Sequence, residues 1–222
     1  MTAAAPDGRS RWLQLADEIP GCTACPELVA GRTQVVVGVA PLDARLVLVG
    51  EAPGAQEDAS GVPFVGRAGQ LLDQLLADAG LDRQQLAVLN VLKCRPPGNR
   101  KPATDEVERC RPWLSAQLEA LAPQLVVSLG LSATAWFLGK KIQIGQVRGR
   151  VHEVDGRRVL PTYHPSGALR FGPAGAPMQA LRSDLQLAAK LLASEGVASE
   201  RASQAVPVPE ALDSPRSGTS GR

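Results

Sequence analysis

Long hydrophobic segments are missing from this sequence of 222 residues. No apolar run is long enough to span a bilayer, and the N-terminal residues have neither the basic stretch nor the apolar run of a secretory signal. We therefore expect a cytoplasmic protein without a membrane partner, in a compartment that keeps thiols reduced. Aromatic residues are also scarce, at 3% of the chain, so each one is a candidate for a specific role.

A strong charge imbalance is missing too. Lys and Arg total 24 against 22 Asp and Glu, a formal net charge of +2, so composition alone does not indicate a nucleic-acid partner. Any basic surface must be local. The candidates are Lys93, Arg95, Arg100, Lys101, Lys140, Lys141, Arg148, Arg150 and Arg170.

The common nucleotide-binding motifs do not occur. The glycine-containing loop Gly50-Glu-Ala-Pro-Gly54 is not followed by the Lys-Ser/Thr pair of a Walker A motif, and it does not match the G-x-G-x-x-G pattern of a dinucleotide site. This argues against a nucleotide cofactor.

Four cysteines are present, at Cys22, Cys25, Cys94 and Cys110. The C-x-x-C pair and the two distant residues can supply four thiolates to an iron-sulfur cluster or to zinc, and the spacing leaves that choice open. A zinc site would usually bring a second short pair, so three separate segments favour a cluster. The alternatives are two disulfides or small buried side chains, which a reducing compartment makes less attractive.

The pattern of apolar residues predicts alternating strands and helices. Buried-type runs indicate strands at 45–49, 86–92 and 125–129, and an Asp-Gly turn indicates a hairpin of 151–154 with 157–160. Helical spacing follows from Arg67 to a glycine cap at Gly80, from Thr104 or Asp105 to before Pro123, and from about Pro177 to Glu195. We predict a three-layer α/β/α sandwich with a mainly parallel central sheet.

The length favours one domain, which we place at residues 1–195 and expect to be monomeric. Residues 196–222 are rich in Ser, Glu, Ala, Pro and Gly without an apolar face, and we expect them to form a disordered tail.

Three loops with chemically capable residues follow predicted strands. Ligands bind parallel sheets at the carboxyl ends of their strands, where Glu51, Asn90 and His164 all fall. An Asn there can read the edge of a nucleobase, because its amide offers both a donor and an acceptor. Taken singly, an Asn capping its own turn and a structural His are the more common cases, so their joint placement carries the argument.

These motifs carry a family resemblance. The segments GEAPG with downstream PFVG, NVLKCRPPGNRKP and YHPS, together with the four cysteines, resemble the family 4 uracil-DNA glycosylases, an iron-sulfur type. The match runs from about Cys22 to the final helix. It implies a [4Fe-4S] cluster on all four cysteines, and an enzyme that hydrolyses the glycosidic bond of uracil in DNA and thereby initiates base excision repair of deaminated cytosine.

The resemblance also implies roles for single residues. Phe64 matches the aromatic residue that stacks on the flipped uracil, Asn90 the uracil-reading amide, and His164 the residue that hydrogen-bonds uracil O2. Glu51 lies in the loop that handles the sugar and the attacking water, so the implied catalytic pair is Glu51 and His164. The implied uracil-binding set is Gly50, Ala52, Glu57, Phe64, Asn90 and His164, with Glu57 shaping the pocket against thymine.

DNA contacts are expected around this pocket, and their candidates are Arg100, Lys101, Ser166, Leu169 and Arg170. We expect Gly167 to Phe171, just after the His164 motif, to form the loop that enters the DNA where uracil leaves it. Flipping a base leaves a gap in the stack that an apolar side chain can fill, and we assign Leu169 to that gap and Arg170 to a neighbouring phosphate. The alternative is that Leu169 packs under the last helix.

Two other functions fit part of the pattern. A covalent uracil-binding relative has the same cluster but carries a Lys-Arg-Arg-Ile-His insertion and a Gln in its first loop, where this chain has Arg-Pro-Pro-Gly-Asn-Arg and Ala52. A noncatalytic iron-sulfur or zinc module that binds nucleic acid would leave Asn90, Phe64 and His164 without a joint purpose.

Overall fold

The computed structural model describes residues 7–204, with side chains as far as residue 194. Within this part, five strands form one sheet in the order β2-β1-β3-β5-β4. They are β1 (Leu46–Gly50), β2 (Ala87–Asn90), β3 (Leu125–Leu129), β4 (His152–Val154) and β5 (Arg157–Thr162). Strands β1, β2, β3 and β5 run parallel, and only β4 is antiparallel.

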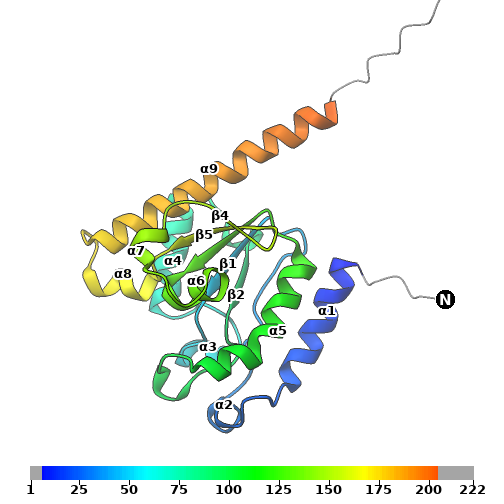
Figure 1. Cartoon of the computed structure of the whole chain (residues 1–222), viewed down its shortest axis with the longest axis vertical. Coiled ribbons are helices and arrows are strands. Elements are labelled where there is room, and N and C mark those ends of the chain that lie inside the picture. Colours follow the sequence, from blue (N-terminus) through cyan, green and yellow to red (C-terminus); the bar gives the residue numbers. More distant parts are fainter. Residues whose placement is uncertain (1–6, 205–222) are drawn as a thin grey trace, which may run out of the picture.

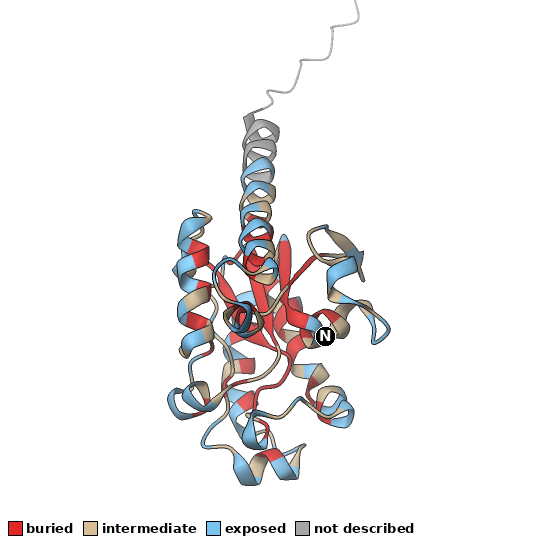
Figure 2. Cartoon of the chain, turned by 90° about the vertical axis from the view of Figure 1, so that its left-hand side faces the viewer, coloured by how far each residue is buried: buried red, intermediate tan, exposed pale blue. Residues whose placement is uncertain are grey.

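Helices cover both faces of this sheet (Figure 1). Their bounds are α1 (Gly8–Glu18), α2 (Pro26–Gly31), α3 (Ala55–Ser60), α4 (Arg67–Asp78), α5 (Thr104–Leu121), α6 (Gly130–Leu138), α7 (Ile144–Val147), α8 (Pro165–Phe171) and α9 (Ala176–Gln204). Figure 2 shows the buried strands between helices whose outward faces are exposed, the three-layer α/β/α arrangement predicted from the sequence.

Successive strand side chains enter two separate cores, because neighbouring residues of a strand point to opposite faces. Leu46 and Leu48 of β1 belong to the core under α4, α8 and α9. Val47 and Val49 belong to the core under α1, α5 and α6. Being buried on both faces explains the continuous apolar runs of these strands.

Several local predictions are confirmed. Helix α4 ends just before Gly80, which has the positive φ of 73° typical of a glycine cap. The β4–β5 hairpin turns at Asp155 and Gly156, whose φ values of 48° and 72° are those of a primed turn. Strand β2 is shorter than predicted and ends at Asn90.

Two predictions are corrected. The segment 167–171, expected to be a loop, lies in helix α8, which His164 caps. The last helix does not end near residue 195 but continues to Gln204. Residues 205–222 lie outside the described part, and the division into a domain and a tail stays a prediction for them. No helix of the described part is long and apolar enough to cross a membrane.

Candidate active site and cysteine centre

A cavity of about 270 Å³ opens at the carboxyl ends of β1 and β2, and we call it the base cavity. It brings together residues from all three loops singled out in the sequence. Its lining includes Glu51, Ala52, Glu57, Phe64, Asn90, Arg100, His164 and Ser166. The parallel topology explains this meeting, because it places the ends of successive strands along one edge of the sheet.

Phe64 forms one wall of the base cavity in a constrained conformation. Its φ of 55° is unusual for a bulky residue, and such strain is retained only where surrounding contacts impose it. A Cβ at Gly69 would lie 1.7 Å from the Phe64 carbonyl oxygen, and a Cβ at Gly50 would lie 2.6 Å from the Phe64 ring. Both positions therefore need glycine for the ring to occupy this place.

Asn90 closes the end of β2 and is only 3% exposed. Its Oδ1 is buried and has no hydrogen-bond partner in the part of the chain that the structure describes. Buried polar atoms are nearly always paired, so an unpaired acceptor in the lining of a cavity indicates that a ligand supplies the donor. The Nζ of Lys93, itself 1% exposed, donates to the main-chain oxygen of Asn90 at 2.8 Å and holds the turn after the strand.

His164 faces Phe64, with ring centroids 5.7 Å apart. The main-chain N–H of Ser166 donates to its Nδ1 at 3.2 Å. Burial lowers the pKa of His164 to about 4, against an opposing effect of Glu57, so the imidazole is neutral at pH 7. With Nδ1 accepting, the single proton sits on Nε2, and the ring is a neutral donor to whatever enters the cavity.

The two carboxylates of the base cavity differ in their contacts. Glu57 accepts from the main-chain N–H groups of Gly54, Val65 and Gly66 at 2.9–3.1 Å, and so fixes the loop on either side of Phe64. The carboxylate of Glu51 has no hydrogen bond or ion pair to any described residue, which leaves it available for a ligand or water.

All four cysteines line one small cavity, and Lys93 lines it too. None forms a disulfide, which removes that alternative. Burial raises the pKa of Cys25 and Cys94, and it raises that of Cys110 to about 11. No group of three or more His, Cys, Asp or Glu side chains in residues 7–194 is arranged to hold a single metal ion. The shared cavity and the four-thiol donor set nevertheless fit a metal centre with thiolate ligands.

Donors around these thiols were not foreseen from the sequence. Arg32 Nη1 donates to the Cys94 sulfur at 3.1 Å, and Trp113 Nε1 donates to that of Cys22 at 3.3 Å. Such N–H···S bonds favour the thiolate form and tune metal centres. Each pair is separated by more than 60 residues, so no local pattern could have indicated it.

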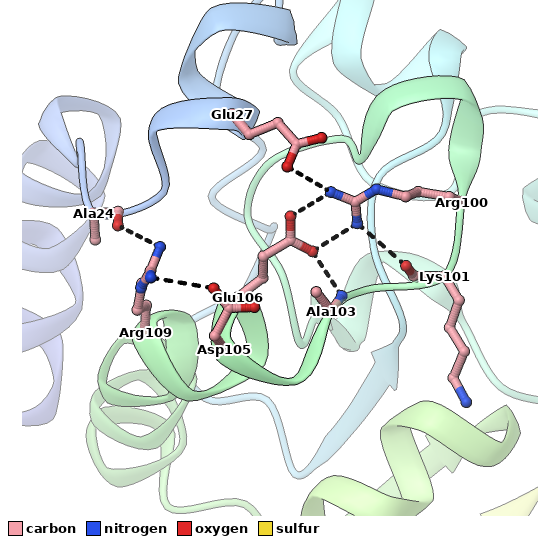
Figure 3. Close-up of polar contacts among 8 residues, drawn as sticks. All are labelled: Ala24, Glu27, Arg100, Lys101, Ala103, Asp105, Glu106 and Arg109. Atoms are coloured by element: carbon pink, nitrogen blue, oxygen red, sulfur yellow. Dashed lines mark hydrogen bonds and ion pairs between the residues drawn. The ribbon is translucent and has the colours of Figure 1, made fainter.

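Arg100 joins the three cysteine-bearing segments (Figure 3). Its guanidinium donates to both oxygens of buried Glu106 at 2.8 and 2.6 Å and lies 3.4 Å from Glu27. These bonds connect the loop after Cys94 with α5 and with α2, so the structure gives Arg100 a cross-linking position within the fold. Figure 3 shows the ammonium of Lys101 pointing away from this network, and Lys101 has no ion pair among the described side chains.

Three of the predicted DNA contacts, Ser166, Leu169 and Arg170, lie on α8. Ser166 and Arg170 are exposed and Leu169 is half-buried, so the structure does not separate the two roles considered for Leu169. Phe171, at the end of the same helix, is 65% exposed, and the sequence predicts no role of its own for it. An exposed aromatic residue beside these contacts is a second candidate for entering DNA.

Comparisons with known proteins point in one direction. The model of the uracil DNA glycosylase superfamily matches residues 37–186. The type-4 uracil-DNA glycosylase of Thermotoga maritima is 48% identical over 158 residues, covering 70% of this chain and 82% of that protein. The corresponding protein of Archaeoglobus fulgidus is 44% identical, covering 68% and 80%. The type-5 uracil-DNA glycosylase of Pyrobaculum aerophilum is 32% identical, covering 68% and 80%.

Proposed function

The chain belongs to the uracil DNA glycosylase superfamily and, within it, to the type-4 enzymes, and on that basis we propose that it hydrolyses the N-glycosidic bond of uracil in DNA. This reaction initiates base excision repair of deaminated cytosine. The observation that carries the proposal is the buried Oδ1 of Asn90, which lies in a cavity with Phe64 and His164 and has no partner among residues 7–204. We place the enzyme in the cytoplasm as a monomer, which rests on the sequence alone.

Base recognition follows from the groups that face the base cavity. A uracil flipped out of DNA stacks on Phe64. Its N3–H donates to Asn90 Oδ1, and its O2 accepts from the neutral His164 Nε2. Cytosine has no N3–H, so it would leave the Asn90 oxygen unpaired and be rejected.

Bond cleavage builds negative charge on uracil and positive charge on the sugar. The His164 donor is fixed by Ser166 before the charge develops, so it stabilises the departing uracil anion without reorganisation. The carboxylate of Glu51, which lines the cavity and has no partner among the described residues, orients the water that attacks C1′ and stabilises the cationic sugar.

Turnover is favoured over covalent trapping. The loop from Arg95 to Pro102 contains no histidine, and the first loop carries Ala52, so neither feature of the covalent uracil-binding relative is present.

The proposal is tested by incubating the purified protein with an oligonucleotide that contains one uracil. Many abasic sites per protein molecule are expected. A stable protein–DNA adduct would support the trap, and binding without either product would support a noncatalytic module.

We further propose that Cys22, Cys25, Cys94 and Cys110 hold a [4Fe-4S] cluster. The support is their meeting at one cavity, the N–H donors from Arg32 and Trp113, and the buried ammonium of Lys93, which needs negative charge nearby. When bound, the cluster supplies a cross-link between three segments and thereby positions the loop that begins at Asn90. Anaerobically purified protein should contain about four irons and four sulfides per chain. Stoichiometric zinc without sulfide would refute this assignment.

A further inference from the structure

A second cavity, of about 220 Å³, lies between α5 and α6 and is close in volume to the base cavity. We call it the cationic cavity. The lining residues that matter here are Lys101, Glu108, Arg111, Leu131, Trp136 and Lys140. None of these except Lys101 was among the residues assigned to the site from the sequence.

A third cavity lies between the cationic cavity and the base cavity and shares lining residues with each of them. This cavity, of about 340 Å³, shares Glu51 and His164 with the base cavity, and it shares Lys101 and Leu131 with the cationic one. The three cavities therefore follow one another past the end of β3, so a strand with one nucleotide at His164 has its neighbouring nucleotide directed toward the cationic cavity.

The charges of the cationic cavity favour an anion. Three cations line it, and Glu108 is the acidic residue among them. Glu108 pairs with Arg111 at 3.1 Å and lies 4.0 Å from Lys140, so two positive charges remain in excess. The Lys101 ammonium, unpaired within the described part of the chain, stands between the two cavities.

The cationic cavity also offers flat and apolar surface. The Arg111 guanidinium stacks over the Trp136 ring at 4.7 Å, and Leu131 beside it is 44% exposed. The indole Nε1 of Trp136 is buried without a hydrogen-bond partner in the described residues, so no such bond fixes the ring. Guanidinium planes and aromatic rings are the surfaces on which unpaired bases stack, whereas a free phosphate would need only the cations.

We propose that the cationic cavity binds one nucleotide of the uracil-bearing strand, outside the flipped base. Its base packs on the Arg111–Trp136 stack and Leu131, and its phosphate lies between Lys101 and Lys140. This inference rests on the proposed function, since it assumes that uracil in a DNA strand occupies the base cavity. It adds a subsite that reads single-stranded DNA beside the reacting nucleotide.

The test combines trimmed substrates with variants. Single-stranded oligonucleotides carry one uracil and are shortened step by step on the 5′ or the 3′ side, and kcat/KM for uracil release is measured for each. Removing the nucleotide that fills the subsite should lower the wild-type value by about fivefold to a hundredfold, on one side only. In Trp136→Leu the full-length substrate should already show this loss, and trimming should change little further.

A second variant tests the subsite even if Trp136→Leu does not fold. Lys140→Gln removes a charge from a side chain that is largely exposed, and it should reduce the slope of log(kcat/KM) against log salt by about one. Lys190→Gln, the same change on an exposed position of α9 outside all three cavities, is the control and should leave both measurements unchanged.

The proposal is overturned if trimming has no effect on either side in the wild type, or if it lowers wild type and both variants equally. Failure of the wild type to release uracil from the full-length oligonucleotide would instead refute the proposed function. Equilibrium binding of the same trimmed series to the same variants would then decide whether the subsite exists.

Discussion

Glu106 offers a sharp test of how the cysteine centre is held together. Its side chain is 4% exposed, and its carboxylate accepts from Arg100 at 2.8 and 2.6 Å and from the main-chain N–H of Ala103 at 2.7 Å. Glu106→Gln keeps the shape of the side chain but removes the charge and puts a donor where an acceptor is needed. One Arg100 bond is lost, and the remaining donors meet a neutral amide oxygen in place of a carboxylate.

The size of the effect follows from these contacts. Hydrogen bonds to a buried charged group contribute about 1.5–3 kcal/mol, so the free energy of unfolding should fall by about that amount. For a domain of this size such a loss lowers Tm by about 3–12 °C. Because the same bonds connect the segments that carry Cys25, Cys94 and Cys110, the variant should also retain less iron after purification.

The assay is thermal and urea unfolding of wild type and Glu106→Gln, with Glu108→Gln as a matched control on the same helix. Glu108 is exposed and its ion pairs are at the surface, so the control should change stability by less than about 0.5 kcal/mol. The bonds from Arg100 lower the pKa of Glu106 below its ordinary value of 4.5. Its contribution is therefore complete above pH 4.5 and is lost as the pH falls further. Equal stability of both variants at pH 7 would refute the reasoning.

Three further predictions concern the active site and α8. Lys93→Met removes the hydrogen bond to the Asn90 carbonyl, so the single-turnover rate of uracil release should fall by about tenfold while the fold is retained. An unchanged rate would show that this bond is dispensable. The pKa of His164, lowered to about 4, predicts no step in that rate near pH 6.5 as the pH falls from 8 to 5, and a step there would mean that the imidazole titrates normally. Leu169→Ala should slow excision from duplex DNA more than from single strands, with little change in Tm. Phe171→Ala should do the same if its exposed ring is the side chain that fills the gap left by the flipped base. Equal loss on both substrates would assign the residue to packing.

The central part of the fold and of the site could be predicted because both depend on local patterns. The strands β1 and β3 are short apolar runs that end at a glycine or before one, and the hairpin has an Asp-Gly turn. Once the sheet is parallel, the residues after its strands must lie along one edge. That rule alone predicts that Glu51, Asn90 and His164 lie close together.

The remaining features depend on contacts between distant residues. Nothing local distinguishes Arg100, which pairs with buried Glu106, from its neighbour Lys101, which does not. The donors to the cysteine sulfurs and the stack of Arg111 on Trp136 likewise arise only when separate segments pack together. The sequence does not indicate helix α8, because seven residues with an internal glycine are too few to show a helical period.

The central claim is that Asn90, Phe64 and His164 form the cavity in which uracil is released. The most direct measurement is the single-turnover rate of uracil release from a single-stranded oligonucleotide by wild type, Asn90→Ala and His164→Ser. The account predicts rapid formation of abasic sites by the wild type and a rate lower by roughly two to four orders of magnitude in each variant. Rates within a few-fold of wild type in both variants would contradict it.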